Sequence, residues 1–133
     1  MIHGIGVDIT QIDRIGRILS RFAGRFLLRA FHESEIIQYK KLGEESPSAP
    51  PNRAQATYVA SRWAVKEATF KAFRHGRVLF PEIYVLSENN KYPRLELIGG
   101  AKDVASQLGI KQSHLSISHD GDYAVAQVIF LLC

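Results

Sequence analysis

Residues 53–73, RAQATYVASRWAVKEATFKAF, contain the clearest helical pattern in the chain, and we expect a helix from Ala54 to Phe73. At about 100° per residue, one side of this helix is an apolar stripe, formed by Ala56, Ala60, Trp63, Ala64 and Ala68. Glu67 and Lys71 fall in the middle of the stripe, whereas Arg62 and Lys66 lie toward the polar side. Charge inside an apolar stripe needs an explanation, because it is costly unless it is paired or binds a metal.

Glu67 and Lys71 are four residues apart, so the simplest interpretation is a salt bridge at the edge of the core. Spacing alone favours this interpretation and a functional one equally. A second isolated carboxylate, Asp8, shifts the balance, because two carboxylates together with phosphate groups are the usual arrangement around Mg²⁺. The sequence therefore indicates a candidate metal site formed by Asp8 and Glu67.

Asp8 belongs to a segment of regular alternation, from Ile2 to Ile9, which predicts a β-strand. Glycine inside a strand often marks a close approach by another group. We therefore expect Asp8 at the strand end, beside open space, although ordinary turn chemistry before a helix would also explain an aspartate there. The two faces of the strand differ, with His3, Ile5, Val7 and Ile9 on the apolar face and Gly4, Gly6 and Asp8 on the other.

The next segment predicts a helix from the N-cap residue Thr10 to about Phe22, with Asp13 completing a variant of the capping box. Its buried stripe is expected to contain Ile12, Ile15, Leu19 and Phe22. The opposite side carries arginines at three- and four-residue spacing, Arg14, Arg17, Arg21 and Arg25. Such a row is by default a solvated face. The functional alternative is a docking surface for an acidic helix, where opposite charge raises association rate and specificity.

The remaining pattern predicts an α+β fold with an antiparallel sheet at the C-terminal end. A helix at 33–42 is followed by a proline-rich loop at 44–52. Beyond the long helix we expect strands at 82–86, 94–98, 114–118 and 123–131, with a helix at 101–108. Residues 119–122, HDGD, separate the last two strands, and an Asp-Gly pair there is a strong hairpin signal.

Composition restricts the class of protein. A chain of 133 residues with 46% hydrophobic residues fits one domain, residues 1–133, that needs no disulfide or structural metal. Cys133 is the single cysteine, which indicates a reducing compartment, and no run approaches the roughly 18 apolar residues of a membrane helix, so we expect a soluble protein. The net charge of +4 favours an anionic partner.

Motifs exclude several enzyme classes. The chain has no GxxxxGK[ST], GxGxxG, GxSxG or HExxH motif, which argues against ordinary NTPases, dehydrogenases, serine hydrolases and metalloproteases. His119 is either a turn residue or a group that binds phosphate or transfers a proton. The other four histidines show no metal-ligand spacing.

Three blocks of sequence resemble the holo-acyl carrier protein synthase family of 4′-phosphopantetheinyl transferases. They are GIGVDI at 4–9, RWAVKEA at 62–68 with Lys71 and Ala72, and ISH at 117–119 with YAVA at 123–126. Each block alone is a weak motif. The ordered set extends over nearly the whole chain and is highly specific.

The resemblance implies long helices packed on a small three-stranded antiparallel sheet, in a homotrimer with active sites between subunits. It implies Mg²⁺-dependent transfer of 4′-phosphopantetheine from coenzyme A to a serine of apo-acyl carrier protein, releasing 3′,5′-ADP, in fatty acid biosynthesis. Asp8 and Glu67 would bind Mg²⁺, and Lys71 would stabilise developing charge. The residues around coenzyme A would be Arg62, Lys66, Lys71, Pro93 (in the turn at 90–93) and His119. The carrier-binding residues would be Arg14, Arg17 and Arg21. The acceptor of the serine proton stays open between a metal-bound water and a carboxylate.

The chain departs from the family pattern at two places. The segment after Lys71 and Ala72 is FRHGR where the family has a Gly-Thr-Gly-like loop, and Asp120 stands where a hydroxyl residue is more usual. These departures motivate a second hypothesis, an inactive binder of coenzyme A or of the carrier protein. The pI near 9.4 motivates a third, a nucleic-acid-binding module, but RNA-binding signatures are absent. The family implies a cytoplasmic protein, or a mitochondrial one in a eukaryote.

Overall fold

A computed structural model describes residues 1–46, 48–87 and 92–133. It confirms the predicted α+β class, with small differences at most element ends and a much longer first helix. The elements in chain order are β1 (Ile2–Gln11), α1 (Ile12–Ala30), α2 (Glu33–Leu42), α3 (Arg53–Phe73), the short 3₁₀ helix η1 (Phe80–Glu82), β2 (Ile83–Leu86), β3 (Arg94–Leu97), α4 (Gly99–Gln107), β4 (Gln112–Asp120) and β5 (Tyr123–Leu131).

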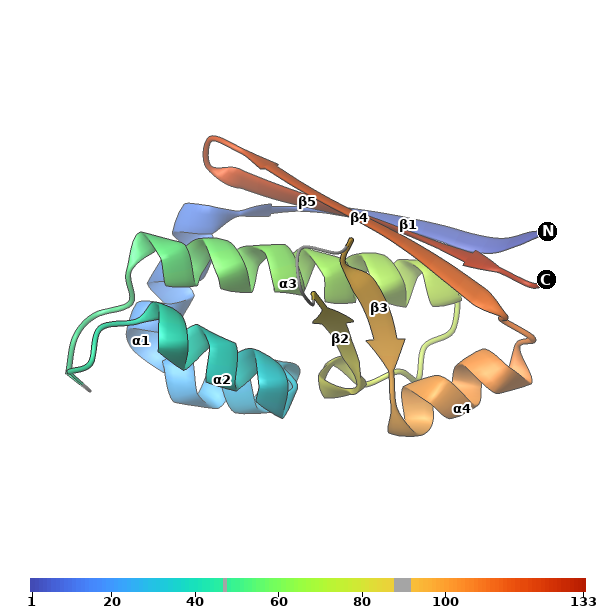
Figure 1. Cartoon of the computed structure of the whole chain (residues 1–133), viewed down its shortest axis with the longest axis horizontal. Helices are drawn as coiled ribbons and strands as arrows, with labels where there is room; N and C mark the ends of the chain where they lie inside the picture. The colour runs from blue at the N-terminus through green and yellow to red at the C-terminus, as the bar shows by residue number, and fades with distance from the viewer. Residues whose placement is uncertain (47, 88–91) are drawn as a thin grey trace.

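α3 lies at the centre of the molecule, with a three-stranded sheet on one side and α1 and α2 on the other (Figure 1). The sheet has the strand order β1-β5-β4 and is antiparallel throughout. β4 and β5 form the predicted hairpin, and its turn places Gly121 at a φ of 58°, which glycine adopts readily. β2 and β3 form a separate antiparallel pair.

β1 packs on α3 through its glycine face. A Cβ atom at Gly6 would lie 1.7 Å from the carbonyl oxygen of Ala68, and one at Gly4 would lie 2.1 Å from that of Ala72. This is the close approach that the glycines indicate. The apolar face of β1 points the other way and is open to solvent. The strand also continues to Gln11, so Asp8 lies inside it and not at its end.

The N-terminus of α1 is capped from a distant part of the chain. Gln11, and not Thr10, occupies the N-cap position, and it makes no side-chain cap bond. Asp122, in the β4–β5 turn, instead accepts hydrogen bonds from the amides of Ile12 (2.8 Å, main-chain oxygen) and Asp13 (3.0 Å, carboxylate). The predicted local cap is therefore wrong, and the hydroxyl of Thr10 is not needed to start the helix.

α1 extends beyond its predicted end at about Phe22, because the helix continues through a kink at that residue, where φ is −136° and ψ is 25°. The kink turns Phe22 out of the buried stripe, and its side chain is 52% exposed. Beyond the kink, a second set of apolar residues packs against the core. The buried residues of the two halves are Ile12, Ile15, Leu19, Leu27 and Ala30.

Candidate active site

Asp8 of β1 lies beside Lys71 and Glu67 of α3, where the glycine face of the strand meets the helix. The Lys71 ammonium donates a hydrogen bond to the carbonyl oxygen of Val7 at 3.0 Å and lies 3.5 Å from Asp8 Oδ1. The other carboxylate oxygen of Asp8, Oδ2, accepts a hydrogen bond from the Thr10 hydroxyl at 2.8 Å. Lys71 therefore forms an ion pair with Asp8, across two elements, and also acts electrostatically on Glu67.

The carboxyl of Glu67 has a pKa above its ordinary value, because burial disfavours its charge and the nearby Asp8 carboxylate repels it. Lys71 and Arg14 lower this pKa and so offset part of the increase. A divalent cation would relieve the repulsion between the two carboxylates. We refer to Asp8, Glu67 and Lys71 together as the carboxylate cluster.

The donor set of the carboxylate cluster fits Mg²⁺. Two carboxylates provide hard oxygen ligands, and Mg²⁺ completes its coordination with water and substrate phosphates. Among residues 1–46, 48–87 and 92–133, no three or more His, Cys, Asp or Glu side chains gather as a potential metal site. A cation held by protein ligands together with a phosphate substrate therefore suits this chain better than a closed structural metal site.

A groove of about 670 Å³ on the other flank of α3 brings together Arg62, Pro93 and His119, three of the residues expected around coenzyme A. Arg62 stacks over the ring of Tyr58 at 4.7 Å and donates a hydrogen bond to the Ser61 hydroxyl at 3.1 Å. Its Nε is buried and has no hydrogen-bond partner in the part of the chain that the structure describes. A fixed guanidinium beside a histidine is suited to binding a phosphate. We call this the nucleotide-type groove.

Sequence reasoning missed the residues that hold Arg62 in place. Tyr58 and Arg62 are four residues apart on α3, and this spacing was the available signal for their contact. In the turn at 90–93, Asn90 and Lys91 lie outside the described residues, whereas Pro93 lines the groove.

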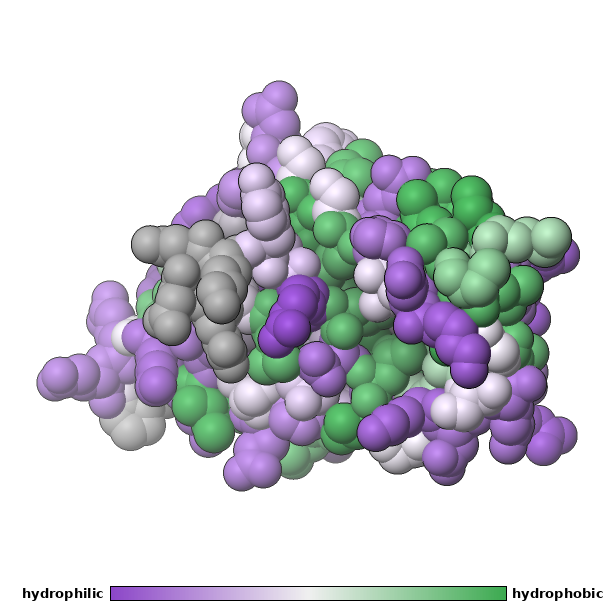
Figure 2. Space-filling model, turned by 45° about the vertical axis from the view of Figure 1, so that its right-hand side comes forward, coloured by the Kyte–Doolittle hydropathy of each residue, from purple (hydrophilic) through white to green (hydrophobic). Residues whose placement is uncertain are grey.

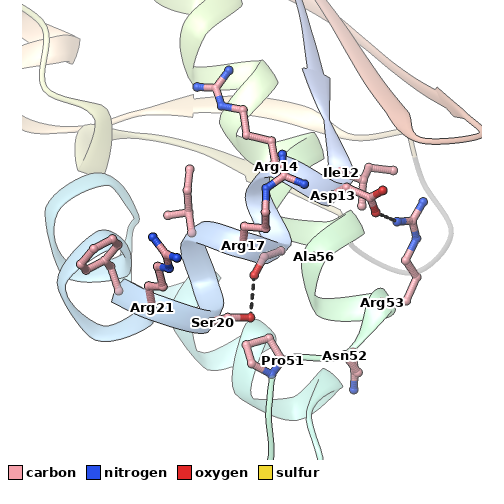
Figure 3. A pocket seen from close by; sticks show the side chains of 13 residues that line it. Ile12, Asp13, Arg14, Arg17, Ser20, Arg21, Pro51, Asn52, Arg53 and Ala56 are labelled. Atoms are coloured by element: carbon pink, nitrogen blue, oxygen red, sulfur yellow. Dashed lines mark hydrogen bonds and ion pairs between the residues drawn. The ribbon is translucent and has the colours of Figure 1, made fainter.

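A second groove, of about 730 Å³, runs between α1 and the start of α3. Arg14, Arg17 and Arg21 project from α1 along it (Figure 3), and Ile18 and Phe22 contribute apolar surface. Basic side chains beside an apolar floor complement an amphipathic segment with acidic residues. We call this the arginine groove. One of its residues, Arg14, also lowers the pKa of Glu67 in the carboxylate cluster.

Arg53 lies at the rim of both grooves. Its Nη1 is 2.7 Å from Asp13 Oδ1 and 3.1 Å from Asp122 Oδ1, and the contact with Asp13 is drawn in Figure 3. These exposed ion pairs contribute little to stability individually. Their role is geometric, because they tie the start of α1 to the turn that follows His119.

Lys66 lines neither groove, and its expected contact with coenzyme A needs correction. The side chain is fully buried, and its ammonium pairs with Glu35 Oε1 at 2.7 Å and donates hydrogen bonds to the carbonyl oxygens of Phe80 and Ile83. Burial lowers the pKa of Lys66, and the Glu35 carboxylate opposes that change. Helical spacing placed Lys66 toward the polar side, but the segment containing η1 covers that side.

The carboxylate cluster and the nucleotide-type groove lie on opposite flanks of α3. Asp8 is on the edge strand β1 and His119 is on the edge strand β4, with β5 between them. Along α3, Arg62 and Glu67 are separated by five residues, or about 140° around the axis at roughly 100° per residue. In the described part of one chain, the two sets of residues therefore lie on different sides of α3 and line no common groove among those described.

A model of the 4′-phosphopantetheinyl transferase superfamily matches residues 4–128. The chain belongs to this superfamily. The holo-[acyl-carrier-protein] synthase of Vibrio campbellii is 38% identical over 132 residues, which cover 97% of this chain and 97% of the relative. The synthase of a Wolbachia strain from Drosophila simulans is 37% identical over 130 residues, covering 97% and 98%.

Solved structures of the superfamily share the fold of this transferase. The Helicobacter pylori holo-[acyl-carrier-protein] synthase, in complex with coenzyme A, superposes with a TM-score of 0.76 at 29% identity over 96% of this chain and 99% of that one. The Plasmodium yoelii acyl carrier protein synthase, with ADP bound, gives 0.84 at 28% identity over 98% and 95%. The predicted family and fold are thus confirmed, and the chain is an enzyme of the holo-[acyl-carrier-protein] synthase type.

No helix in the described ranges has the length and apolar character to cross a membrane.

Proposed function

We propose that the protein transfers 4′-phosphopantetheine from coenzyme A to a serine of an apo-acyl carrier protein, requires Mg²⁺ and releases 3′,5′-ADP. The observation that carries this proposal is the Asp8–Glu67 pair, two neighbouring carboxylates beside the Lys71 ammonium. The names of the relatives and the coenzyme A complex of the Helicobacter pylori protein support it. In this proposal, residues 1–133 act as one transferase domain.

The nucleotide-type groove binds coenzyme A in this proposal. Arg62 and His119 contact phosphate oxygens, and Pro93 lines the part that receives the nucleoside. The Nε of Arg62 is the strongest support: it has no acceptor among the described residues, and a buried donor without an acceptor is stabilised by an incoming anion.

The carboxylate cluster carries out the transfer step. The serine oxygen forms a bond to the β-phosphorus of coenzyme A and gives its proton to a water or a carboxylate of the site, while the bond from this phosphorus to the 3′,5′-ADP oxygen breaks. Lys71 stabilises the negative charge that develops on the leaving group. Asp8 and Glu67 hold Mg²⁺, which neutralises phosphate charge and polarises the phosphorus when bound.

The arginine groove receives the carrier protein. Arg14, Arg17 and Arg21 form ion pairs with an acidic helix, and the apolar floor covers that helix's apolar side chains. Because Arg14 also lies close enough to Glu67 to influence its charge, a docked partner presents its serine near the carboxylate cluster.

A second copy of the chain completes the site, in a homotrimer. The carboxylate cluster and the nucleotide-type groove face away from each other in one chain, so a neighbouring copy is needed to join them. The outer face of the sheet offers an association surface, since Ile5, Val7 and Ile9 are each more than half exposed. On the face seen in Figure 2, apolar side chains form patches that hydrophilic side chains border.

We place the reaction in the cytoplasm. The Vibrio and Wolbachia relatives are bacterial proteins, and they give no support to a mitochondrial location.

Intact-protein mass spectrometry tests the proposed transfer. An apo-acyl carrier protein is incubated with the enzyme and coenzyme A, with and without Mg²⁺. We expect a gain of one phosphopantetheine on the carrier serine only when Mg²⁺ is present. Absence of the gain across several carriers, with coenzyme A still bound, would instead indicate an inactive binder.

A further inference from the structure

We propose that Thr10 is a positioning residue that orients the Asp8 carboxylate for metal binding. This inference rests on the function proposed above, because it assumes that Asp8 is a metal ligand. Thr10 does not touch the reacting groups in this proposal. It acts through Asp8.

Thr10 and Asp8 lie on the same face of β1, because side chains two residues apart in a strand point in the same direction. Thr10 is buried, with 4% of its surface exposed. Its hydroxyl donates a hydrogen bond to Asp8 Oδ2 at 2.8 Å, which is a good distance for an O–H donor to a carboxylate.

This contact makes the two oxygens of Asp8 different. Oδ2 has a neutral, buried donor that stays in place when a cation arrives. Oδ1 faces the Lys71 ammonium at 3.5 Å, and that ammonium has a shorter hydrogen bond, at 3.0 Å, to the carbonyl oxygen of Val7. Oδ1 is therefore the oxygen that can exchange its weak contact for a metal, and Asp8 is expected to bind through one oxygen.

The hydroxyl of Thr10 has no competing structural task at the helix that follows. α1 receives its cap from Asp122 instead, through the amide of Asp13. The Thr10–Asp8 bond thus resembles the outer hydrogen bonds that orient metal-binding carboxylates in other proteins, whose loss typically weakens metal binding about 10- to 100-fold.

Three variants test the inference. Thr10→Val keeps the shape of the side chain and removes the donor, whereas Thr10→Ser keeps the donor. Thr69→Val is the matched control, because Thr69 is also fully buried and donates to a backbone carbonyl, that of Val65, at 2.6 Å. Binding of Mn²⁺ in the presence of 3′,5′-ADP is measured by electron paramagnetic resonance, and transfer rates are measured against Mg²⁺ concentration.

We expect Thr10→Val to weaken Mn²⁺ binding about 10-fold and to raise the KM for Mg²⁺ more than it lowers kcat. Thr10→Ser and Thr69→Val are expected to bind Mn²⁺ within about twofold of the wild type. Equal binding by Thr10→Val and wild type overturns the inference, and so does an equal loss in Thr69→Val, which would indicate general loosening. If Thr10→Val does not fold, Thr10→Ala compared with Thr10→Ser asks the same question.

Asp8→Asn separates this inference from the proposed function. Loss of Mn²⁺ binding in Asp8→Asn with no change in Thr10→Val rejects only the role of Thr10. Unchanged Mn²⁺ binding in Asp8→Asn rejects Asp8 as a ligand, and with it both the role of Thr10 and the metal site of the proposed function, whereas the transfer itself is tested by the mass of the carrier protein.

Discussion

At Glu67, ligand binding and stability make opposite demands. Burial, with the Asp8 carboxylate, raises the pKa of this carboxyl, so the folded protein holds the proton more tightly than the unfolded chain does. The corresponding stability is complete at pH values below the unfolded pKa and is lost as the pH rises through the raised folded pKa. An ionised Glu67 at neutral pH therefore costs stability, which is consistent with a role in binding a cation.

Glu67→Gln is expected to abolish transfer without lowering stability at neutral pH. In buffer containing a chelator, its melting temperature should equal or exceed that of the wild type at pH 7.5, and the advantage should shrink toward pH 4. Calorimetry at both pH values checks this, and carrier modification is followed by mass spectrometry. A melting temperature well below the wild type at pH 7.5 would show that the charge of Glu67 stabilises the fold.

Lys66 has a structural role, although it is next to Glu67 in the sequence and was expected at the coenzyme A site. Lys66→Met removes the partner of a buried carboxylate, Glu35, whose Oε2 already lacks a hydrogen bond in the described part of the chain. We expect a loss of about 3–5 kcal/mol in the free energy of unfolding, measured with urea. Adding Glu35→Gln removes the stranded charge but keeps an acceptor for the amide of His32, so the double variant should recover much of the loss. No recovery would contradict a paired-charge explanation.

At the scale of elements, the contact between β1 and α3 creates the site. The backbone of the strand approaches the helix so closely that glycine is required, and this approach brings Asp8 beside Lys71. The geometry of the carboxylate cluster therefore depends on Gly4 and Gly6, which have no side chain that could take part in the reaction.

Gly6→Ala should separate these two elements, because the added Cβ would lie 1.7 Å from the carbonyl oxygen of Ala68. We expect the free energy of unfolding to fall by about 3 kcal/mol. Gly24→Ala, in α1, is the control: nothing lies within 4 Å of its added Cβ, and it should stabilise the helix by about 0.5–1 kcal/mol. Urea unfolding of both variants makes the comparison, and similar values for the two would refute the close-packing argument.

At the scale of the whole molecule, the two halves of the proposed site belong to different flanks. If neighbouring copies join them, two inactive variants with lesions on different flanks should restore activity to each other. If each chain worked alone, mixing would restore nothing.

Glu67→Gln and Arg62→Ala form such a pair. After joint unfolding and reassembly at equal amounts, we expect about one quarter of the wild-type transfer rate, because random assembly gives that share of interfaces two intact halves. Each variant reassembled alone is the control and should stay inactive.

Val7→Lys, on the outer face of the sheet, should reduce the assembly size measured by light scattering.

Local sequence patterns were sufficient for most elements and for the pairing of Asp8 with Glu67. The periodicity of residues 53–73, the Asp-Gly turn and the alternation in β1 depend on backbone geometry that nearby residues determine. The three blocks that resemble the family also identified Arg62 and His119, which the structure brings to one groove.

Only the tertiary structure decided where these elements meet. Helical spacing could not show that η1 covers Lys66, that Asp122 caps α1 from across 109 residues, or that Thr10 therefore turns to Asp8. It also could not show that the glycine face of β1 packs inward while the apolar face stays open. The physical reason is the same in each case: a local pattern states which side chains share a face, whereas burial and hydrogen bonding depend on which distant segment covers that face.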